Sequence, residues 1–390
     1  MPVKYANANE VLPENLLMMI QKYYRGGYLY IPMGTCHIPK AKTDYKIELE
    51  NRNQHIYLKH LEGRTNGQLG KLYHLSESSI RRIVSAEKEK YRKMKRTIEQ
   101  ITDLWGIEVR ELSQIYPSAW EINDSYVVKI YYDPNQLERN IKISTVLSDC
   151  DIPTAKIVPT KTGEQYAACE NALFLITEKL QGSNILNVKD ENAARQVGAA
   201  IARLHMAFLK CEKEIAFWDN SLLKEMKGWI REALTGNGWQ PVSESEYLSV
   251  TGQLEAVYED LPKQLIHRDV HFGNFLFMDG SFSGYIDFDL SQKNIRIFDI
   301  CYFLTGLLAE ETEAPFTKAE WLRRVQAVLA GYESISRLSE KEKDTIPCVM
   351  KCIEILFVAY FINIKDTKSA DNAKQVLYFI QDCENDLKKI

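Results

Sequence analysis

The stretch that most constrains the fold is residues 265–290, which reads LIHRDVHFGNFLFMDGSFSGYIDFDL. It carries Asp269 and Asn274 on a short segment that precedes an apolar run. The Asp279-Gly280 pair after that run is a strong signal for a hairpin turn. A second short strand then ends at Asp287. The stretch therefore predicts a loop that bears Asp269 and Asn274, followed by a β-hairpin that ends at Asp287.

Two carboxylates and an amide in this order are the groups that phosphoryl transfer requires. Asp269 can accept the proton of an attacking hydroxyl, and Asn274 and Asp287 offer hard oxygen ligands to Mg²⁺. His267 opens the loop, and Asp289 stands where a protein kinase has the glycine of D-F-G. The alternative is a capped turn that carries surface acids, which the order of loop, hairpin and terminal Asp disfavours.

Length and cysteine usage indicate a multidomain protein of a reducing compartment. A chain of 390 residues exceeds what one core usually serves, so two or three domains are expected. The eight cysteines form no C-x-x-C pair and have no metal-ligand spacing. We find no leader sequence and no apolar run of membrane-spanning length. These features predict a reduced, cytoplasmic protein without a membrane partner.

Charge is distributed unevenly along the chain. Residues 51–96 hold 12 lysines and arginines against 4 acidic residues, whereas the whole chain has a formal net charge of −4. A basic module is therefore joined to an acidic one. This asymmetry points to two partners of opposite sign.

The basic segment predicts three closely spaced helices, over residues 52–61, 66–73 and 77 onward. Ser76 is the expected N-cap of the third helix, and residues 86–96 continue as a charged linker helix. A short helix, a tight turn and a capped helix with Arg in its second turn are typical of a helix-turn-helix. The alternative is a small helical bundle docked on the rest of the chain, with the charges on a solvated face.

The N-terminal head resembles the Mor-type transcription activator domain. The resemblance rests on TNGQLGKLYHLSESSIRRIV (residues 65–84) together with LPENLLMMIQKYYRGGYLYIP (residues 12–32). It implies double-stranded DNA as a partner of residues 51–96. The candidate contacts in the major groove are Ser78, Ser79, Arg81 and Arg82.

The segment after the head predicts a small sheet that contains a functional lysine. The expected strands cover residues 109–112, 119–122, 126–130, 156–158 and 173–177. Lys129 lies inside the third strand, where a lone cation is costly without an anionic partner. In the kinase template such a lysine binds nucleotide phosphates and pairs with a helix Glu. Glu138 is the candidate partner, although the register of related kinases places Asn140 there; alternatively, Lys129 faces solvent.

The remainder of the chain predicts mainly helices. An amphipathic helix is expected over residues 191–209, and His205 within it is expected to be a core histidine. Asp299 lies in an otherwise apolar helix start and is expected to order the loop that carries Asp269. Further helices are predicted over residues 318–330, 346–364 and 373–387.

Six motifs in this part resemble the aminoglycoside phosphotransferase and choline kinase-like family. They are YVVKI (126–130), FLITEKLQG (174–182), ARLH (202–205), IHRDVHFGN (266–274), GYIDFD (284–289) and IRIFDICYFL (295–304). The resemblance implies an α+β, bilobal protein-kinase-like fold, with a small antiparallel-sheet N-lobe (97–180) and a helical C-lobe (181–390). An all-α helix-turn-helix domain (1–96) would precede it. A eukaryotic-type protein kinase is the alternative assignment, because the H-R-D motif of those kinases is present at residues 267–269. However, the A-P-E segment that such kinases carry does not follow Asp289.

The same resemblance implies ATP-dependent transfer of a γ-phosphoryl group to a hydroxyl of a small molecule. It assigns Asp269 as catalytic base, with His267 supporting the loop, and Asn274 and Asp287 as Mg²⁺ ligands. Asp289 would contact the metal or its surroundings, and Lys129 would bind phosphates. The acidic body favours a cationic acceptor such as an aminoglycoside or an amino alcohol.

The adenine and phosphate contacts complete this assignment. The end of the strand at Glu178, Lys179 and Leu180 is the candidate hinge, whose backbone would bond the adenine edge. No glycine-rich loop precedes Lys129, so Ser118 is the candidate hydrogen-bond donor to the nucleotide phosphates. GTP stays possible beside ATP as the nucleotide. A different class of function is also open, namely a transcriptional regulator that uses a kinase-like body as a ligand sensor.

Overall fold

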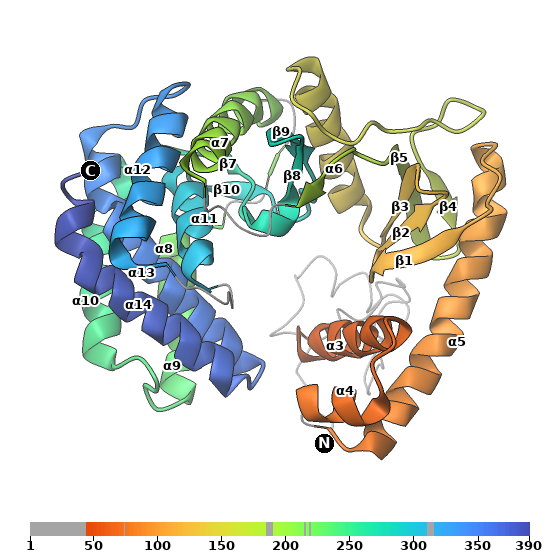
Figure 1. Cartoon of the computed structure of the whole chain (residues 1–390), viewed down its shortest axis with the longest axis horizontal. Helices are drawn as coiled ribbons and strands as arrows, with labels where there is room; N and C mark the ends of the chain where they lie inside the picture. The colour runs from red at the N-terminus through yellow and green to blue at the C-terminus, as the bar shows by residue number, and fades with distance from the viewer. Residues whose placement is uncertain (1–43, 74, 185–189, 214–215, 218–219, 310–315) are drawn as a thin grey trace, which may run out of the picture. The chain divides into compact units, whose positions relative to one another are not determined.

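The computed structural model describes residues 44–73, 75–184, 190–213, 216–217, 220–309 and 316–390. The chain divides into two compact units, Met1–Ile47 and Glu48–Ile390. The second unit contains every described strand and all the described helices except the start of the first one (Figure 1). Residues 12–32, on which part of the head resemblance rests, lie outside the described residues.

Three helices form the described part of the head: α3 (Asp44–Leu61), α4 (Asn66–Leu72) and α5 (Glu77–Ile101). Ser76 is the N-cap of α5, and its hydroxyl accepts a hydrogen bond from the Ser79 amide, as predicted. One buried residue from each helix, namely Ile56, Leu69 and Ile80, builds a small shared core. The spacing and the turns of the three helices thus agree with the sequence prediction.

Helix α5 does not end at the domain boundary predicted at residue 96. It continues to Ile101 and buries Ile98 and Ile101 against the five-stranded sheet, and the Tyr91 ring lies 4.7 Å from that of Trp120. The charged stretch of residues 86–96 is therefore the middle of one continuous helix. The compact unit begins at Glu48, because α5 shares the core of the sheet that follows it.

The N-lobe sheet is antiparallel with the strand order β1-β2-β3-β5-β4. Its strands are β1 (Leu112–Tyr116), β2 (Ala119–Ile122), β3 (Tyr126–Tyr131), β4 (Ala167–Cys169) and β5 (Ala172–Glu178). Asn123 and Asp124, both at φ 54°, form the tight turn between β2 and β3. Residues 156–158, predicted as a strand, make only an isolated bridge at Ile157, and the first strand begins at Leu112 instead of residue 109.

Strand alternation sorts the side chains of this sheet onto two faces. Trp120 pairs with Val128 and Ala119 pairs with Lys129 across β2 and β3. Because successive residues of a strand point to opposite faces, Trp120 faces the core shared with α5, and Lys129 faces the other side. Helix α6 (Pro134–Asp149) follows β3 and is capped by Asp133.

The C-lobe is mainly helical, with short strands near its junction with the N-lobe (Figure 1). Its strands are β6 (Ser183–Asn184), β7 (Lys263–Ile266), β8 (Phe275–Met278), β9 (Ser281–Tyr285) and β10 (Gln292–Ile295). Its α-helices are α7 (Glu191–Cys211), α8 (Leu222–Glu225), α9 (Arg231–Gly236), α10 (Glu244–Val257), α11 (Ile297–Ala309), α12 (Lys318–Glu333), α13 (Glu340–Asn363) and α14 (Thr367–Leu387). The predicted hairpin is present as β8 and β9, and its turn residues Asp279 and Gly280 both have positive φ angles.

Helices α7 and α12 cross at very close range because glycine stands at the contact on both. A Cβ atom at Gly198 would lie 2.0 Å from the Val328 carbonyl oxygen, and one at Gly331 would lie 2.0 Å from that of Arg195. Only a residue without a side chain fits at either position. This crossing forms part of the large C-lobe core, which surrounds the site described below.

Of the described helices, α13 is the one long and apolar enough to cross a membrane by length and composition alone. However, 72% of its apolar window is buried inside the protein. Core helices of soluble proteins pass the same test, so its apolarity is accounted for by packing. The described cysteines are all free thiols.

Candidate active site

Asp269 lies on the loop of residues 267–274, here called the Asp269 loop, which connects β7 to β8. Its Oδ1 accepts a hydrogen bond from the Tyr302 hydroxyl at 2.8 Å. Its Oδ2 lies 3.2 Å from Asn274 Nδ2 and 3.4 Å from His271 Nε2. The Gly273 amide donates to His271 Nδ1, which places the proton of a neutral His271 on Nε2, facing Asp269. Both carboxylate oxygens are therefore held in a defined direction.

These contacts also set the charge of Asp269. Burial raises the pKa of this carboxyl, but the hydrogen bonds from His271 and Tyr302 outweigh burial and bring the pKa below its ordinary value. Asp269 is thus ionised at neutral pH. An ionised, oriented carboxylate can accept a proton from a hydroxyl group that approaches it.

A second carboxylate, that of Asp299 at the start of α11, holds the backbone of the Asp269 loop. It is fully buried and accepts the amide protons of His267 at 2.8 Å and Arg268 at 2.9 Å. His205 Nε2 lies 3.1 Å from the same carboxylate, and the other ring nitrogen of His205 bonds the Tyr332 hydroxyl. Asp299 thus orders the loop, and His205 is a core histidine, as the sequence indicated.

The side chains of His267 and Arg268, at the start of the Asp269 loop, make structural contacts. The His267 ring is buried against Phe288, at 5.1 Å between ring centroids, and neither ring nitrogen has a hydrogen-bond partner among the residues that the structure describes. Arg268 donates to Glu225 of α8 at 2.7 Å and stacks over Phe298 at 4.1 Å. His267 therefore contributes its amide and its packing to the site.

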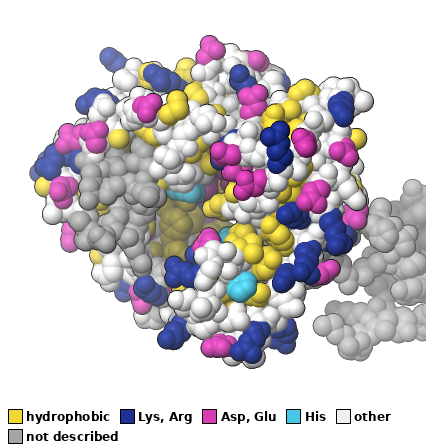
Figure 2. Space-filling model, turned by 45° about the vertical axis from the view of Figure 1, so that its right-hand side comes forward, with side chains coloured by type: hydrophobic (Ala, Val, Ile, Leu, Met, Phe, Trp, Pro, Cys, Tyr) yellow, Lys and Arg dark blue, Asp and Glu magenta, His cyan; other side chains and the backbone are white. Residues whose placement is uncertain are grey.

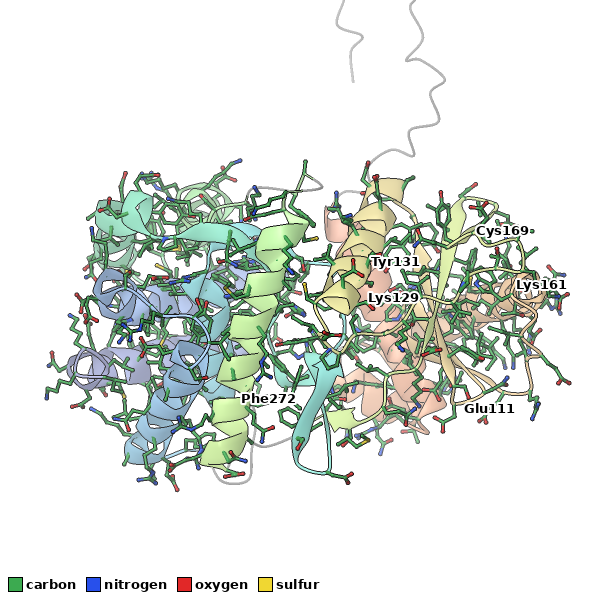
Figure 3. All side chains as sticks on the ribbon, turned by 90° about the horizontal axis from the view of Figure 1, so that it is seen from above. Glu111, Lys129, Tyr131, Lys161, Cys169 and Phe272 are labelled. Atoms are coloured by element: carbon green, nitrogen blue, oxygen red, sulfur yellow. The ribbon has the colours of Figure 1, made fainter. Side chains whose placement is uncertain are left out.

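Lys129, labelled in Figure 3, lies on β3 near Tyr131. Its side chain pairs with the two carboxylates that end the hairpin segment. Its ammonium lies 3.1 Å from Asp287 and 3.6 Å from Asp289, and its side chain is 26% exposed. Burial lowers the pKa of Lys129, but Tyr131 and the two carboxylates outweigh it, so the pKa is raised. Lys129 is therefore a paired cation at the junction of the lobes, and the alternative of a solvent-facing strand lysine is excluded.

Glu138 is not the partner of Lys129, and that prediction is wrong. Glu138 is exposed on α6, whereas Leu137 and Asn140 lie on the buried face of the helix. Asn140 donates its side-chain amide to the Gln136 carbonyl at 3.1 Å. Burial raises the pKa of Asp289, and Asn140, from the same buried face, partly offsets that rise. Neighbouring helical positions point about 100° apart, so a two-residue difference in register exchanges a buried position for an exposed one.

The predicted hinge residues lie at the end of β5 and directly after it, since Glu178 is the last residue of the strand, but two of their amides are engaged inside the N-lobe. The Glu178 amide donates to the Lys156 carbonyl at 2.8 Å, and the Lys179 amide donates to the Ser125 carbonyl at 2.7 Å. The Lys179 ammonium pairs with Glu121 and Asp124. A cavity of about 240 Å³ borders Glu178, Lys179 and Leu180.

The remaining predicted residues lie on exposed surfaces. Ser118 is exposed in the two-residue turn between β1 and β2. Ser78, Arg81 and Arg82 are exposed on the first turns of α5, and Arg81 lies 3.4 Å from Glu77. Ser79 is half-buried and bonds the Ser76 hydroxyl. Figure 2 shows lysine and arginine side chains interspersed with acidic side chains over the face that it draws.

The donor set at the ends of the Asp269 loop and the hairpin fits a magnesium ion. In the described part of the chain no three His, Cys, Asp or Glu side chains come together as a metal site. Asp287 and Asp289 nevertheless share one lysine, and among the described residues Asp289 Oδ1 is buried without a hydrogen-bond partner. The Asn274 side-chain nitrogen points to Asp269, which leaves its oxygen as the ligand atom. Two carboxylates and an amide oxygen are ligands that Mg²⁺ prefers.

Sequence reasoning missed three contributors to this site: Glu225, His271 and Tyr302. His271 lies two residues from Asp269, and Tyr302 lies three residues after Asp299. Residues three apart on a helix share a face, so Tyr302 could have been found from the helical position of Asp299. No local signal marks Glu225, because its partner Arg268 is 43 residues away.

The model of the phosphotransferase enzyme family matches residues 108–341. The homoserine kinase of Gluconacetobacter diazotrophicus is 28% identical over 220 residues, which cover 55% of this chain and 66% of that protein. The homoserine kinase of Gluconobacter oxydans is 27% identical over 217 residues, covering 54% and 64%. The chain thus spans slightly less than two thirds of the length of these relatives.

Solved structures show the same fold. An amicoumacin kinase has a TM-score of 0.58 at 20% identity, covering 77% of this chain and 96% of that one. Aminoglycoside 2'-phosphotransferase-IIIa has a TM-score of 0.52 at 16% identity, covering 75% and 98%. The family match begins at residue 108 and leaves out the head. The sheet, the Asp269 loop and the helical C-lobe all lie within the matched region or directly after it, and the chain belongs to the phosphotransferase enzyme family.

Proposed function

We propose that this protein is an ATP-dependent small-molecule kinase that transfers a γ-phosphoryl group to a hydroxyl of its acceptor. The observation that carries the proposal is the ionised Asp269 carboxylate, oriented by Tyr302 and Asn274 on a loop that Asp299 holds. The paired Lys129 and the carboxylates of the hairpin segment supply the second half of a phosphoryl-transfer site.

Each group has a defined task in this reaction. Asp269 accepts the proton of the acceptor hydroxyl, whose oxygen forms the new bond to the γ-phosphorus while the bond to the β-phosphate oxygen breaks. Lys129 binds the phosphates. Asn274 and Asp287 would hold Mg²⁺, with Asp289 beside them. The metal, when bound, neutralises charge on the phosphate oxygens.

We propose a cationic, amino-alcohol-like or aminoglycoside-like acceptor. Relatives named as homoserine kinase, amicoumacin kinase, aminoglycoside phosphotransferase and aminopropanol kinase support a small hydroxylated acceptor. One of these relatives was solved with AMP-PNP and another with GDP, so both ATP and GTP belong in the test as donors.

A second candidate function is sequence-specific DNA binding by the head, which would make the protein a regulator with a kinase-like sensor. It is favoured by the capped helix α5 and by the exposed side chains of Arg81 and Arg82. Its test is duplex binding by the full chain across a salt series. Loss of affinity on Arg81→Ala and Arg82→Ala, with a reduced salt slope, would support it, and salt-independent retention would contradict it.

The proposed kinase activity is tested by Mg²⁺-dependent consumption of ATP and GTP over a panel of aminoglycosides and amino alcohols. Asp269→Asn removes the base and should lower kcat by about 10²–10⁴-fold while nucleotide binding persists. The matched control is Asp279→Asn, at the exposed hairpin tip, where Asn also tolerates a positive φ. Equal activity of the two variants, or no turnover with any acceptor, would contradict the proposal.

A further inference from the structure

Helix α11 contacts the Asp269 loop at two points that lie one helical turn apart. Asp299 accepts two backbone amide protons of the loop. Tyr302, three residues later, donates its hydroxyl proton to the side chain of Asp269 at 2.8 Å. Because both residues project from the same face of one helix, α11 holds the loop backbone and the Asp269 carboxylate in fixed positions relative to each other.

We propose that Tyr302 is a positioning residue, whose hydroxyl fixes the rotation of the Asp269 carboxylate relative to the acceptor hydroxyl. This inference rests on the proposed kinase function. In this proposal α11 aligns the catalytic base through two residues. Asp299 positions the loop backbone, and Tyr302 orients the side chain of Asp269.

The tyrosine can act in this way because its own ring is immobilised. Its centroid lies 5.8 Å from that of Phe298 and 5.7 Å from that of Phe357 on α13. Phe357 in turn lies 6.1 Å from Phe361, with nearly parallel rings. A hydroxyl on a packed aromatic ring loses little freedom when it binds, so its hydrogen bond defines the carboxylate direction more tightly than a flexible donor would.

The other contacts of Asp269 are weaker restraints. Asn274 Nδ2 and His271 Nε2 both face Oδ2, at 3.2 and 3.4 Å, whereas Tyr302 alone among the described side chains is recorded at Oδ1. A carboxylate offers about four acceptor positions, so one hydrogen bond at Oδ1 still leaves room for the acceptor hydroxyl. The other charged or titratable groups that act on the pKa values of this pair include His267, Arg268, His271 and Glu354.

The test compares Tyr302→Phe with Tyr247→Phe in the full-length chain. Tyr247 is also a buried tyrosine with one short hydrogen bond, 2.7 Å to the Met226 carbonyl, so its substitution matches the structural loss. We expect Tyr302→Phe to lower kcat by about 10–100-fold, with KM for nucleotide and acceptor within about twofold of wild type. Tyr247→Phe should leave kcat unchanged. An unchanged kcat in Tyr302→Phe, or an equal fall in both variants, would overturn the inference.

A second measurement decides the inference without turnover. In crystal structures of the wild type and Tyr302→Phe, we expect the Asp269 carboxylate to rotate or to split between orientations in the variant alone. An Asp269 orientation identical in both would overturn the positioning role. If the wild type consumed no nucleotide with any acceptor, the kinase proposal would fail, whereas the crystal comparison would still report whether Tyr302 orients Asp269.

Discussion

Substitution of Glu354 by Gln should stabilise the protein at neutral pH. Glu354 lies on α13 with 1% of its surface exposed, and its Oε1 has no hydrogen-bond partner within the part of the chain that the structure describes. Burial raises the pKa of this carboxyl to about 8, although the Thr305 hydroxyl partly offsets the effect. The native protein therefore keeps a proton on Glu354 at pH 7, where the unfolded chain releases it.

The sign and size of the effect follow from these two pKa values. The folded pKa of about 8 lies above the ordinary value of 4.5, so the free energy of unfolding falls as pH rises between them. At about 1.36 kcal/mol per pH unit, the penalty is roughly 1 kcal/mol at pH 5 and about 3 kcal/mol at pH 7. Glutamine has nearly the same shape and does not ionise. Glu354→Gln should therefore gain more stability at pH 7 than at pH 5.

The assay is urea unfolding of wild type and Glu354→Gln at pH 5 and pH 7. Glu342→Gln, on the same helix, is the contrasting variant: burial raises the pKa of Glu342, but bonds from Arg296 at 2.6 and 2.8 Å bring it below its ordinary value. A lowered folded pKa contributes stability at pH 7 that is lost as pH falls through it, so Glu342→Gln should destabilise. A Glu354→Gln gain that is equal at both pH values would refute the reasoning.

Two further substitutions test the scaffold. Asp299→Asn replaces one carboxylate oxygen by an amide group that cannot accept a backbone proton from the Asp269 loop. The substitution should lower kcat and should lower the free energy of unfolding in urea by about 1–3 kcal/mol. An unchanged kcat would contradict the role of α11. Gly198→Ala places a Cβ atom 2.0 Å from the Val328 carbonyl oxygen and should lower the free energy of unfolding by about 1–3 kcal/mol or more. Gly252→Ala, on α10 with open space around it, should raise the free energy of unfolding by roughly 0.5–1 kcal/mol. A change of the same sign in both variants would contradict the packing argument.

Local chemistry made several features readable before the tertiary structure was known. The Asp279-Gly280 pair specifies a hairpin turn because both residues tolerate positive φ, and the observed angles of 52° and 73° agree. Ser76 caps α5 because its short hydroxyl reaches an amide three residues on. The order of loop and hairpin therefore brought Asp269 and Asn274 into one prediction, and both lie on the Asp269 loop.

Long-range packing decided the rest. The residues after Lys129 are typical of a helix, but whether Glu138 or Asn140 faces the site depended on which side of α6 packs against the rest of the protein. Likewise, α5 continues past residue 96 because Ile98 and Ile101 bury themselves against the sheet, and nothing in the charged run itself signals that contact. The hydrogen bonds of Arg268 to α8 and of Asp269 to α11 also join segments that are distant in the sequence. The packing of whole helices and strands determines such side-chain partners, and the local sequence pattern does not encode that packing.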